Sequence, residues 1–213
     1  GIGALATAVI QSSGATTVMV VGFVNAGIMN LFQATAMIMG ANIGTTITAQ
    51  IAALGSFDVA AYASMLAVIG MFMFMLLKKD KVKTIGLALA GLGLVFIALE
   101  LMGAAMTVFR NMPIITDFLQ KCSNPLLLLI FGIVFTALVQ SSSAVTTIII
   151  SMVANGMTIG NGANCILYVI LGSNIGSCVT AILSSIGATP NAKRASVIHL
   201  LFNVTGSIIY FTI

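Results

Sequence analysis

Apolar residues fill long stretches of the chain, and short polar steps divide these stretches. The first apolar run covers residues 3–10, and after the polar step Gln11–Gly14 a second run covers residues 15–24. A helix of about nine residues is roughly 13 Å long, less than half of a hydrocarbon core about 30 Å thick. Two such half-helices joined at a polar tip predict a re-entrant hairpin, whose tip is buried in protein or lines an aqueous cavity.

The same pattern returns later in the chain, with apolar runs over residues 126–139 and 144–154. Residues 7–17 and 136–146 are identical at seven of eleven positions, and both contain the triplet Gln-Ser-Ser. Because the identities fall on polar residues and not only on common apolar ones, they indicate an internal duplication. The sequence thus predicts two hairpins with matching tips.

A second repeated block follows each hairpin. Residues 40–49 and 172–181 are identical at six of ten positions, and both contain a Gly-x-Asn-Ile-Gly segment. Two glycines four residues apart in an apolar helix often form a close-packing surface. Here the segments also carry asparagine and hydroxyl side chains and follow a broken hairpin in both halves. We therefore favour two discontinuous helices, broken at 40–44 and 172–176, that contribute to a binding site.

The remaining apolar segments are each long enough to cross a bilayer, which makes the predicted fold class an all-α integral membrane protein. These segments cover residues 35–54, 59–77, 84–106, 163–186 and 195–213.

Composition strengthens the membrane assignment. Of 213 residues, 60% are hydrophobic and 6% are charged, and the mean hydropathy is +1.19, whereas soluble domains carry about 25% charged residues. The net charge of +4 rests on only eight basic and four acidic residues, so the expected partner is the lipid bilayer and not nucleic acid. The three cysteines lack metal-ligand spacing, and we expect no metal ion other than sodium.

Basic residues in the loops predict an orientation. Lys78–Lys83 and Lys193–Arg194 fall on one side of the predicted spans, whereas Arg110 and Lys121 fall on the other side. The positive-inside rule makes the first side cytoplasmic, for a multi-pass protein of the plasma (inner) membrane. The first hairpin then opens to the cytoplasm and the second opens to the outside.

Hairpins that open to opposite sides define inverted-topology repeats, an architecture for alternating access. We assign the repeats to residues 1–83 and 84–213, which together form one transmembrane transport domain. The duplication also predicts a counterpart of helix 84–106 before residue 1. A homodimer is one arrangement in which a second subunit supplies the surface of that helix.

The Gln-Ser-Ser steps carry the candidate chemistry. Each lies where a half-helix begins, so backbone N–H groups without helical partners and side-chain hydroxyls point at the tip and attract an anion. No lysine or arginine lies within these motifs, so a doubly charged anion needs co-bound cations. The side-chain oxygens of Gln11 and Gln140, together with hydroxyls and carbonyls freed at the breaks, are suitable ligands for sodium.

The motifs QSSGATT and QSSSAVTT, followed by GANIGTT and GSNIGSC, resemble those of the type II sodium-phosphate cotransporter family and its bacterial members. Residues 96–106 and 193–206 also resemble that family, so the resemblance covers nearly the whole chain. It implies sodium-driven uptake of inorganic phosphate, with sodium ions as co-transported ligands and no other cofactor. Gly14 departs from the pattern, since it replaces the third serine of the first motif. Carried over by position, the resemblance implies that phosphate and sodium are bound by Gln11, Ser12, Ser13, Thr16, Thr17, Gln140, Ser141, Ser142, Ser143 and Thr146, joined by Asn42, Thr45, Asn174 and Ser177 from the broken helices.

Other functions compete with this interpretation. Sulfate, arsenate or another small oxyanion would meet the same groups, a passive anion pore would need a continuous polar path, and a transport-incompetent membrane scaffold would keep the motifs only for packing. An enzyme is least favoured, because no histidine or lysine base stands beside the serines to activate them. Glu100 is a candidate intramembrane carboxylate. His199 and Asn203 share a helical face and are predicted to make interhelical hydrogen bonds.

Overall fold

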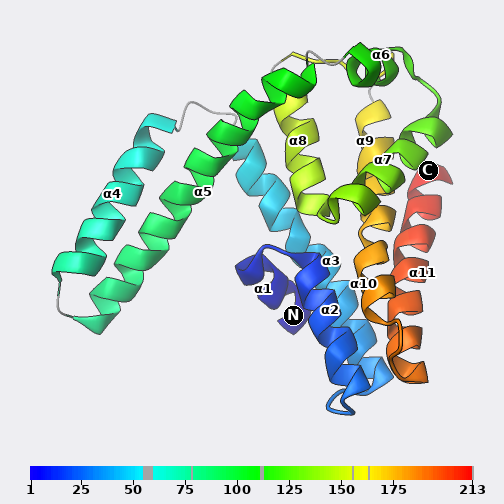
Figure 1. Cartoon of the computed structure of the whole chain (residues 1–213), viewed down its shortest axis with the longest axis horizontal. Helices are drawn as coiled ribbons and strands as arrows, with labels where there is room; N and C mark the ends of the chain where they lie inside the picture. Colours follow the sequence, from blue (N-terminus) through cyan, green and yellow to red (C-terminus); the bar gives the residue numbers. More distant parts are fainter. Residues whose placement is uncertain (55–59, 78, 111–112, 155, 163, 213) are drawn as a thin grey trace.

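The computed structural model of the chain consists of helices and connecting loops (Figure 1). It describes residues 1–54, 60–77, 79–110, 113–154, 156–162 and 164–212, and within these ranges it contains no β-strand. The all-α prediction is therefore confirmed for this part of the chain. Lys78 and the side chain of Glu100 lie outside it. The helices are α1 (Ile2–Ile10), α2 (Ser13–Asn25), α3 (Leu31–Leu54), α4 (Ala60–Leu76), α5 (Asp80–Arg110), α6 (Pro113–Lys121), α7 (Pro125–Val139), α8 (Ser142–Ala154), α9 (Cys165–Gly176), α10 (Cys178–Ser184) and α11 (Pro190–Thr212).

Close helix packing at glycine organises both halves of the chain. Helix α1 lies against α3, and α7 lies against α9. A Cβ atom at Gly44 would collide with the backbone carbonyl of Ala4 on α1, and a Cβ atom at Gly176 would collide with that of Ile133 on α7. The partners of the second contact follow those of the first by 129 and 132 positions (133 − 4 and 176 − 44). Glycine is therefore the residue that lets the backbones of each pair touch.

The predicted break at residues 40–44 is wrong, because α3 is helical without interruption from Leu31 to Leu54. The glycines of this segment serve the contact with α1, and the Thr45 hydroxyl donates back to the carbonyl oxygen of Ala41 at 3.1 Å. The backbone hydrogen bonds of α3 therefore continue through this segment. In the second copy, residues 172–176 are also helical, so the predicted break at this place is wrong as well. An interruption of one residue follows at Ser177, between α9 and α10, and the backbone there keeps a right-handed helical conformation (φ −63°, ψ −21°).

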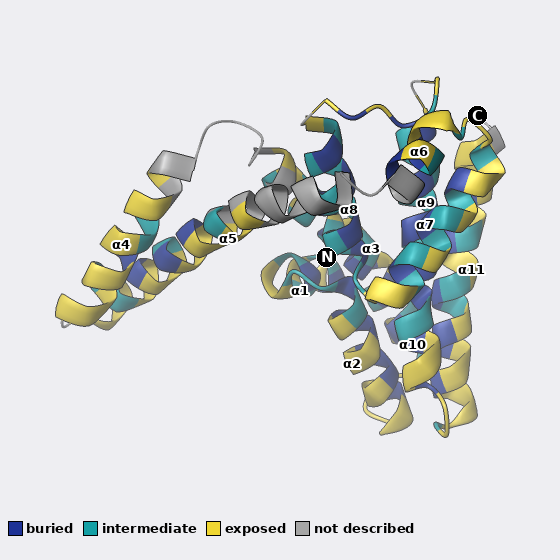
Figure 2. Cartoon of the chain, turned by 45° about the horizontal axis from the view of Figure 1, so that its top comes forward, coloured by how far each residue is buried: buried dark blue, intermediate teal, exposed yellow. Residues whose placement is uncertain are grey.

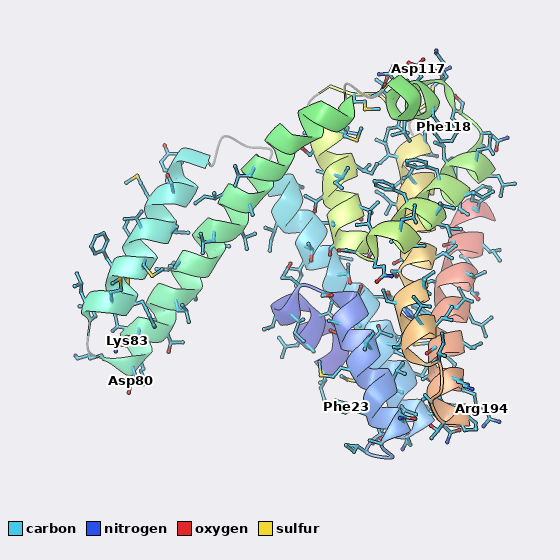
Figure 3. All side chains as sticks on the ribbon, in the orientation of Figure 1. Phe23, Asp80, Lys83, Asp117, Phe118 and Arg194 are labelled. Carbon is cyan, nitrogen blue, oxygen red and sulfur yellow. The ribbon has the colours of Figure 1, made fainter. Side chains whose placement is uncertain are left out.

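Both predicted pairs of half-helices are present, as α1 with α2 and α7 with α8. Their adjoining ends lie in the middle of the molecule (Figure 1). From there α2 runs to the end that carries Arg194, whereas α8 runs to the end near Asp117 (Figure 3). The two short helices α2 and α8 therefore leave the centre in opposite directions.

Two clusters of buried apolar side chains surround this centre. Val21, Ile38 and Ala195 belong to the first cluster, which joins α2, α3 and α11. Leu128 and Val169 belong to the second, which joins α6, α7, α8 and α9. Each cluster contains one of the two short helices that leave the centre, so α2 and α8 pack in different apolar cores.

The helices α4 and α5 form a pair that projects away from the remaining helices (Figure 1). Gly70 on α4 and Gly86 on α5 allow close approach within the pair, because a Cβ atom at either would collide with the backbone of the other helix. Large apolar side chains on α4 are exposed, among them Met65 and Met75, and most of the ribbon of this helix is coloured as exposed in Figure 2. These two residues bound a methionine-rich run, and its exposure is typical of a lipid-facing or adaptable packing surface.

Two helical segments are long and apolar enough to cross a membrane, among the residues that the structure describes. They are Cys165–Ser184, with a mean hydropathy of 1.9, and Pro190–Phe211, with a mean hydropathy of 1.2. They coincide with the last two of the five predicted spans. The helical fold, these two segments and the exposed apolar surface are consistent with a membrane protein.

Candidate functional site

Each Gln-Ser-Ser step ends one helix and begins the next. Ser12 is the N-cap of α2, and its hydroxyl oxygen accepts a hydrogen bond from the backbone nitrogen of Ala15 at 3.1 Å. Ser141 does the same for α8, with the backbone nitrogen of Ala144 at 3.2 Å. These bonds satisfy one of the free N–H groups at each helix start. In both hairpins the serine after the glutamine therefore caps the second helix.

The glutamine of each step ends the preceding helix in the left-handed conformation. Gln11 has a φ of 59° and Gln140 has a φ of 57°, and no other non-glycine residue of the described chain has a positive φ. This conformation costs a residue with a Cβ atom roughly 1–2 kcal/mol. Glycine is the usual residue at such a helix end, so the conservation of glutamine in both copies of the repeat indicates a use for its side chain.

We predict that Gln140→Gly is more stable than Gln140→Ala by about 1 kcal/mol, because only alanine keeps the cost of the left-handed conformation. The two variants lack the same side chain, and the Gln140 side chain is exposed and makes no hydrogen bond with a described residue. Thermal unfolding in detergent measures the difference. Equal melting temperatures for the two variants would show that the chain turns differently at this position.

Two polar cavities adjoin the hairpin tips and share Ser142 and Ser143. The larger has a volume of about 170 Å³ and is lined by Asn42, Thr45, Thr46, Ala49, Ser142, Ser143, Thr146, Ile170, Ser173 and Asn174. The smaller has a volume of about 10 Å³ and is lined by Ser12, Ser13, Gly14, Gln140, Ser141, Ser142, Ser143, Ser177 and Thr180. A water molecule needs roughly 10–15 Å³ by this measure. The larger cavity therefore has room for a small oxyanion, whereas the smaller is at the lower limit for one water-sized particle.

The cavities bring together most of the residues that the sequence nominates. Both hairpin tips contribute to the smaller cavity, although they are far apart in the chain. The nominated residues that line one or both cavities are Ser12, Ser13, Asn42, Thr45, Gln140, Ser141, Ser142, Ser143, Thr146, Asn174 and Ser177.

Three nominated residues of the first hairpin line neither cavity. The side-chain oxygen of Gln11 accepts a hydrogen bond from the Thr48 hydroxyl at 2.7 Å. Thr16 is buried, where its hydroxyl donates to the carbonyl of Ser12 and accepts from Thr7, each at 3.0 Å. Thr17 is also buried, and its hydroxyl has no hydrogen-bond partner among the described residues. In this conformation the hydrogen bonds of Gln11 and Thr16 stabilise the first hairpin, and none of the three side chains lines a cavity.

Sequence reasoning missed several residues that line the cavities, notably Thr46, Ser173 and Thr180. Ser173 is the variable position of the Gly-x-Asn-Ile-Gly segment, and its hydroxyl accepts a hydrogen bond from Thr136 at 2.8 Å. Thr180 was visible as one of the identical positions of the repeated block, because Thr48 stands at the equivalent place. The identity of that pair was the signal that could have found it.

Gly14, where the first motif lacks its third serine, lies on the smaller cavity. A Cβ atom at this position would be 3.5 Å from the hydroxyl of Thr180, an ordinary van der Waals contact. Packing therefore leaves space for a serine here. The departure from the motif removes a hydroxyl from the cavity and is not required by the fold.

An asparagine on α11 connects the two Gly-x-Asn-Ile-Gly segments. Asn203 is 2% exposed, accepts a hydrogen bond from Nδ2 of Asn42 at 2.9 Å, and donates to the carbonyl oxygen of Asn174 at 2.8 Å. Nε2 of His199 lies 3.2 Å from the same amide nitrogen. The predicted interhelical bonding is confirmed for Asn203, which links α11 to α3 and α9.

The cavities carry polar groups and, among the residues that the structure describes, no charged side chain. Hydroxyls and amides line them, and the described lining residues include no aspartate, glutamate, lysine, arginine or histidine. The N-termini of α2 and α8 meet at the smaller cavity, and that of α8 also borders the larger one. The partial positive charge at a helix N-terminus favours an anion. Hydroxyl, amide and carbonyl oxygens also suit a hard cation such as sodium. The site can thus hold an anion and a monovalent cation together, with each offsetting the charge of the other.

A helical membrane fold with a charge-free polar site between two helix breaks is the organisation of a transport protein, and comparison with known sequences agrees. The chain belongs to the Na+/Pi-cotransporter family, whose sequence profile it matches over residues 1–104 and 112–212. This is a family of membrane transporters and not of enzymes, as predicted. No solved structure matches the chain.

Relatives of the chain include bacterial and animal proteins. "Uncharacterized protein YqeW" of Bacillus subtilis (strain 168) is 33% identical over 94% of this chain and 63% of its own length. "Putative inorganic phosphate export protein YjbB" of Escherichia coli (strain K12) is 31% identical over 98% of this chain and 37% of its own length. The human "Sodium-dependent phosphate transport protein 2B" is 38% identical over 38% of this chain and 12% of its own length. The chain therefore spans about two fifths to three fifths of the bacterial relatives it matches.

Proposed function

We propose that the chain forms the transport core of a secondary transporter that couples sodium influx to uptake of inorganic phosphate, with the anion bound near the membrane midplane. The observation that carries the proposal is the meeting of two matching helix breaks, at Ser12 and Ser141, beside cavities whose described lining residues are all uncharged. Helix N-termini and hydroxyls favour a phosphate there. Membership of the Na+/Pi-cotransporter family and the printed name of the human relative support phosphate and sodium as the transported ions.

Coupling follows from the electrostatics of the site. A doubly charged phosphate receives no compensating charge from the described side chains that line the two cavities. Transfer of an unpaired ion from water into such a site is costly, and co-bound sodium reduces that cost. The oxygens of Asn42, Thr45 and the tip serines are suitable sodium ligands. Binding of each ion therefore raises the affinity for the other.

We further propose that residues 1–83 and 84–213 are inverted repeats with re-entrant hairpins, and that they work by alternating access. Support comes from the opposite directions of α2 and α8 in Figure 1. The two halves also differ in one pair of equivalent residues. The hydroxyl of Thr48 donates to the side chain of Gln11 at 2.7 Å. The equivalent Thr180 donates to the carbonyl of Ser177 at 2.8 Å instead of to Gln140. Unequal halves are what a carrier open to one side requires.

The proposed location is the plasma (inner) membrane, with the basic segments Lys78–Lys83 and Lys193–Arg194 on the cytoplasmic side. Lys193 and Arg194 lie near the start of α11 and not in the predicted loop. Lys83 and Arg194 lie on the lower side of the molecule in Figure 3, and Asp117 lies on the upper side. The projecting pair α4 and α5 exposes apolar side chains, which supports contact with lipid or with a second copy in a homodimer.

Flux measurements on liposomes containing the purified protein test the proposal. Labelled phosphate is expected to accumulate with an inward sodium gradient and not when potassium replaces sodium, because the anion needs the cation in the site. Excess unlabelled phosphate should suppress the flux more than sulfate does. Equal suppression by sulfate would point to a general oxyanion carrier, and sodium-independent flux would point to a passive pore. Absence of both phosphate flux and phosphate binding would favour a scaffold.

The name of YjbB makes phosphate export a second candidate. A sodium symporter runs in the direction that its gradients set, so the same liposomes loaded with sodium and phosphate should release phosphate in a sodium-dependent way. Release that needs no sodium, together with uptake that sodium fails to drive, would favour export by a different coupling.

A further inference from the structure

The two asparagines that face the larger cavity are held by a third residue that does not line it. Asn203 lies on α11, is 2% exposed, and is absent from both cavity linings. Its side-chain oxygen accepts from Nδ2 of Asn42 at 2.9 Å, and its side-chain nitrogen donates to the carbonyl of Asn174 at 2.8 Å. One buried amide therefore contacts both segments of the repeated block, which are 132 positions apart (174 − 42).

The neighbours of Asn203 allow only one orientation of its amide group. If oxygen and nitrogen exchanged places, two acceptors would face each other at Asn174, because its backbone carbonyl cannot act as a donor. The side-chain nitrogen of Asn203 also donates to Sγ of Cys178 at 3.1 Å, and Nε2 of His199 lies 3.2 Å from the same nitrogen. Because a buried amide with an unmade hydrogen bond is destabilising, the bridge has a single stable state.

The hydrogen bonds of Asn203 connect walls of the larger cavity and do not involve the hairpin tips. It connects α3, α9 and α11, whereas Ser142, Ser143 and Thr146 on the opposite wall belong to α8. As long as both bonds of Asn203 are made, Asn42 and Asn174 keep a constant separation. The cavity can then change its shape through α8 without changing the distance between these two asparagines.

We propose that Asn203 is a positioning residue for phosphate and sodium binding, which fixes the walls from the two repeats relative to each other while the hairpins move. The proposal rests on the proposed function, since it assigns Asn203 to the same site. It predicts that Asn203 acts through Asn42 and therefore that the effects of removing either residue are coupled.

The test is a double-mutant cycle on the reconstituted protein with Asn203→Ala, Asn42→Ala and the double variant. Asn203→Ala is expected to raise the apparent KM for phosphate about tenfold, the size expected for a buried polar group left unpaired. The KM of the double variant should be no higher than that of the single variant with the higher KM, because Asn42 is no longer held in place once Asn203 is removed. Additive effects on KM, or a lower amount of folded protein with KM unchanged, would overturn the proposal.

Ser207→Ala is the matched control. Ser207 is a buried polar residue one turn further along α11, and its hydroxyl donates only to the backbone carbonyl of Asn203 within the same helix. Its removal is expected to leave the KM for phosphate within about twofold. If the parent protein shows no sodium-dependent phosphate flux, the proposed function fails. The double-mutant cycle is then measured by melting temperature. Non-additive changes at positions 42 and 203 support the interaction of Asn203 with Asn42, and additive changes overturn it.

Discussion

Replacing Gly172 with alanine is expected to destabilise the folded protein by about 3 kcal/mol, one of the largest effects of a single methyl group in this chain. A Cβ atom at this position would collide with the backbone carbonyl of Leu129 on α7. A backbone carbonyl cannot move aside as the end of a flexible side chain can, so α7 and α9 must separate. Thermal unfolding in detergent, together with the yield of monodisperse protein, measures the loss.

Gly206→Ala provides the matched control for this substitution. Gly206 also lies in a helix, α11, and a Cβ atom there would meet nothing within 4 Å. Alanine favours the helix over glycine by about 1 kcal/mol, so this variant should be as stable as the parent or slightly more stable. Similar melting temperatures for the two alanine variants would mean that α7 and α9 do not touch through their backbones.

The double substitution Ser142→Ala, Ser143→Ala is expected to reduce the affinity for phosphate about a hundredfold. These hydroxyls are shared by the two cavities at the start of α8. A hydrogen bond to a charged group contributes roughly 1.5–3 kcal/mol, and about 1.4 kcal/mol corresponds to a factor of ten. Equilibrium binding of labelled phosphate to the purified protein in sodium buffer measures the change.

Ser185→Ala tests whether the loss is specific to the cavities. Ser185 is buried at the end of α10, where its hydroxyl donates to the carbonyl of Ile182 at 2.8 Å, and it lines neither cavity. Its removal should leave phosphate binding within about twofold. An unchanged affinity in the Ser142→Ala, Ser143→Ala variant would exclude the tip of the second hairpin as the binding site.

The hairpin breaks could be predicted from the sequence because their signals are local. A polar step in an apolar run, with a serine where the next helix starts, needs no information about distant parts of the chain. The two copies at Ser12 and Ser141 support each other, and both cap a helix as expected. Residues of both tips line the smaller cavity, although the tips are far apart in the chain.

The continuous course of α3 could not be predicted in the same way. Glycines at positions 40 and 44 have the spacing both of a helix–helix contact and of a weakened helix. Only the position of α1 distinguishes the two, because Ala4 and Thr7 fill the space that side chains would occupy at Gly44. The role of Asn203 was hidden for a similar reason: its spacing from His199 predicted a shared helical face, but not which helices that face would meet.

Among the residues that the structure describes, no charged side chain lines either cavity, and this affects the response to membrane voltage. A charge that crosses the membrane field exchanges about 2.3 kcal/mol per 100 mV. Under the proposed mechanism, the empty carrier returns without moving a charged group of the binding site across that field. Voltage then acts only on the step in which the carrier holds its ions, and the net charge moved per cycle equals the sodium charge minus the phosphate charge. A transport cycle that moves no net charge would therefore indicate that the sodium and phosphate charges in the site are equal and opposite.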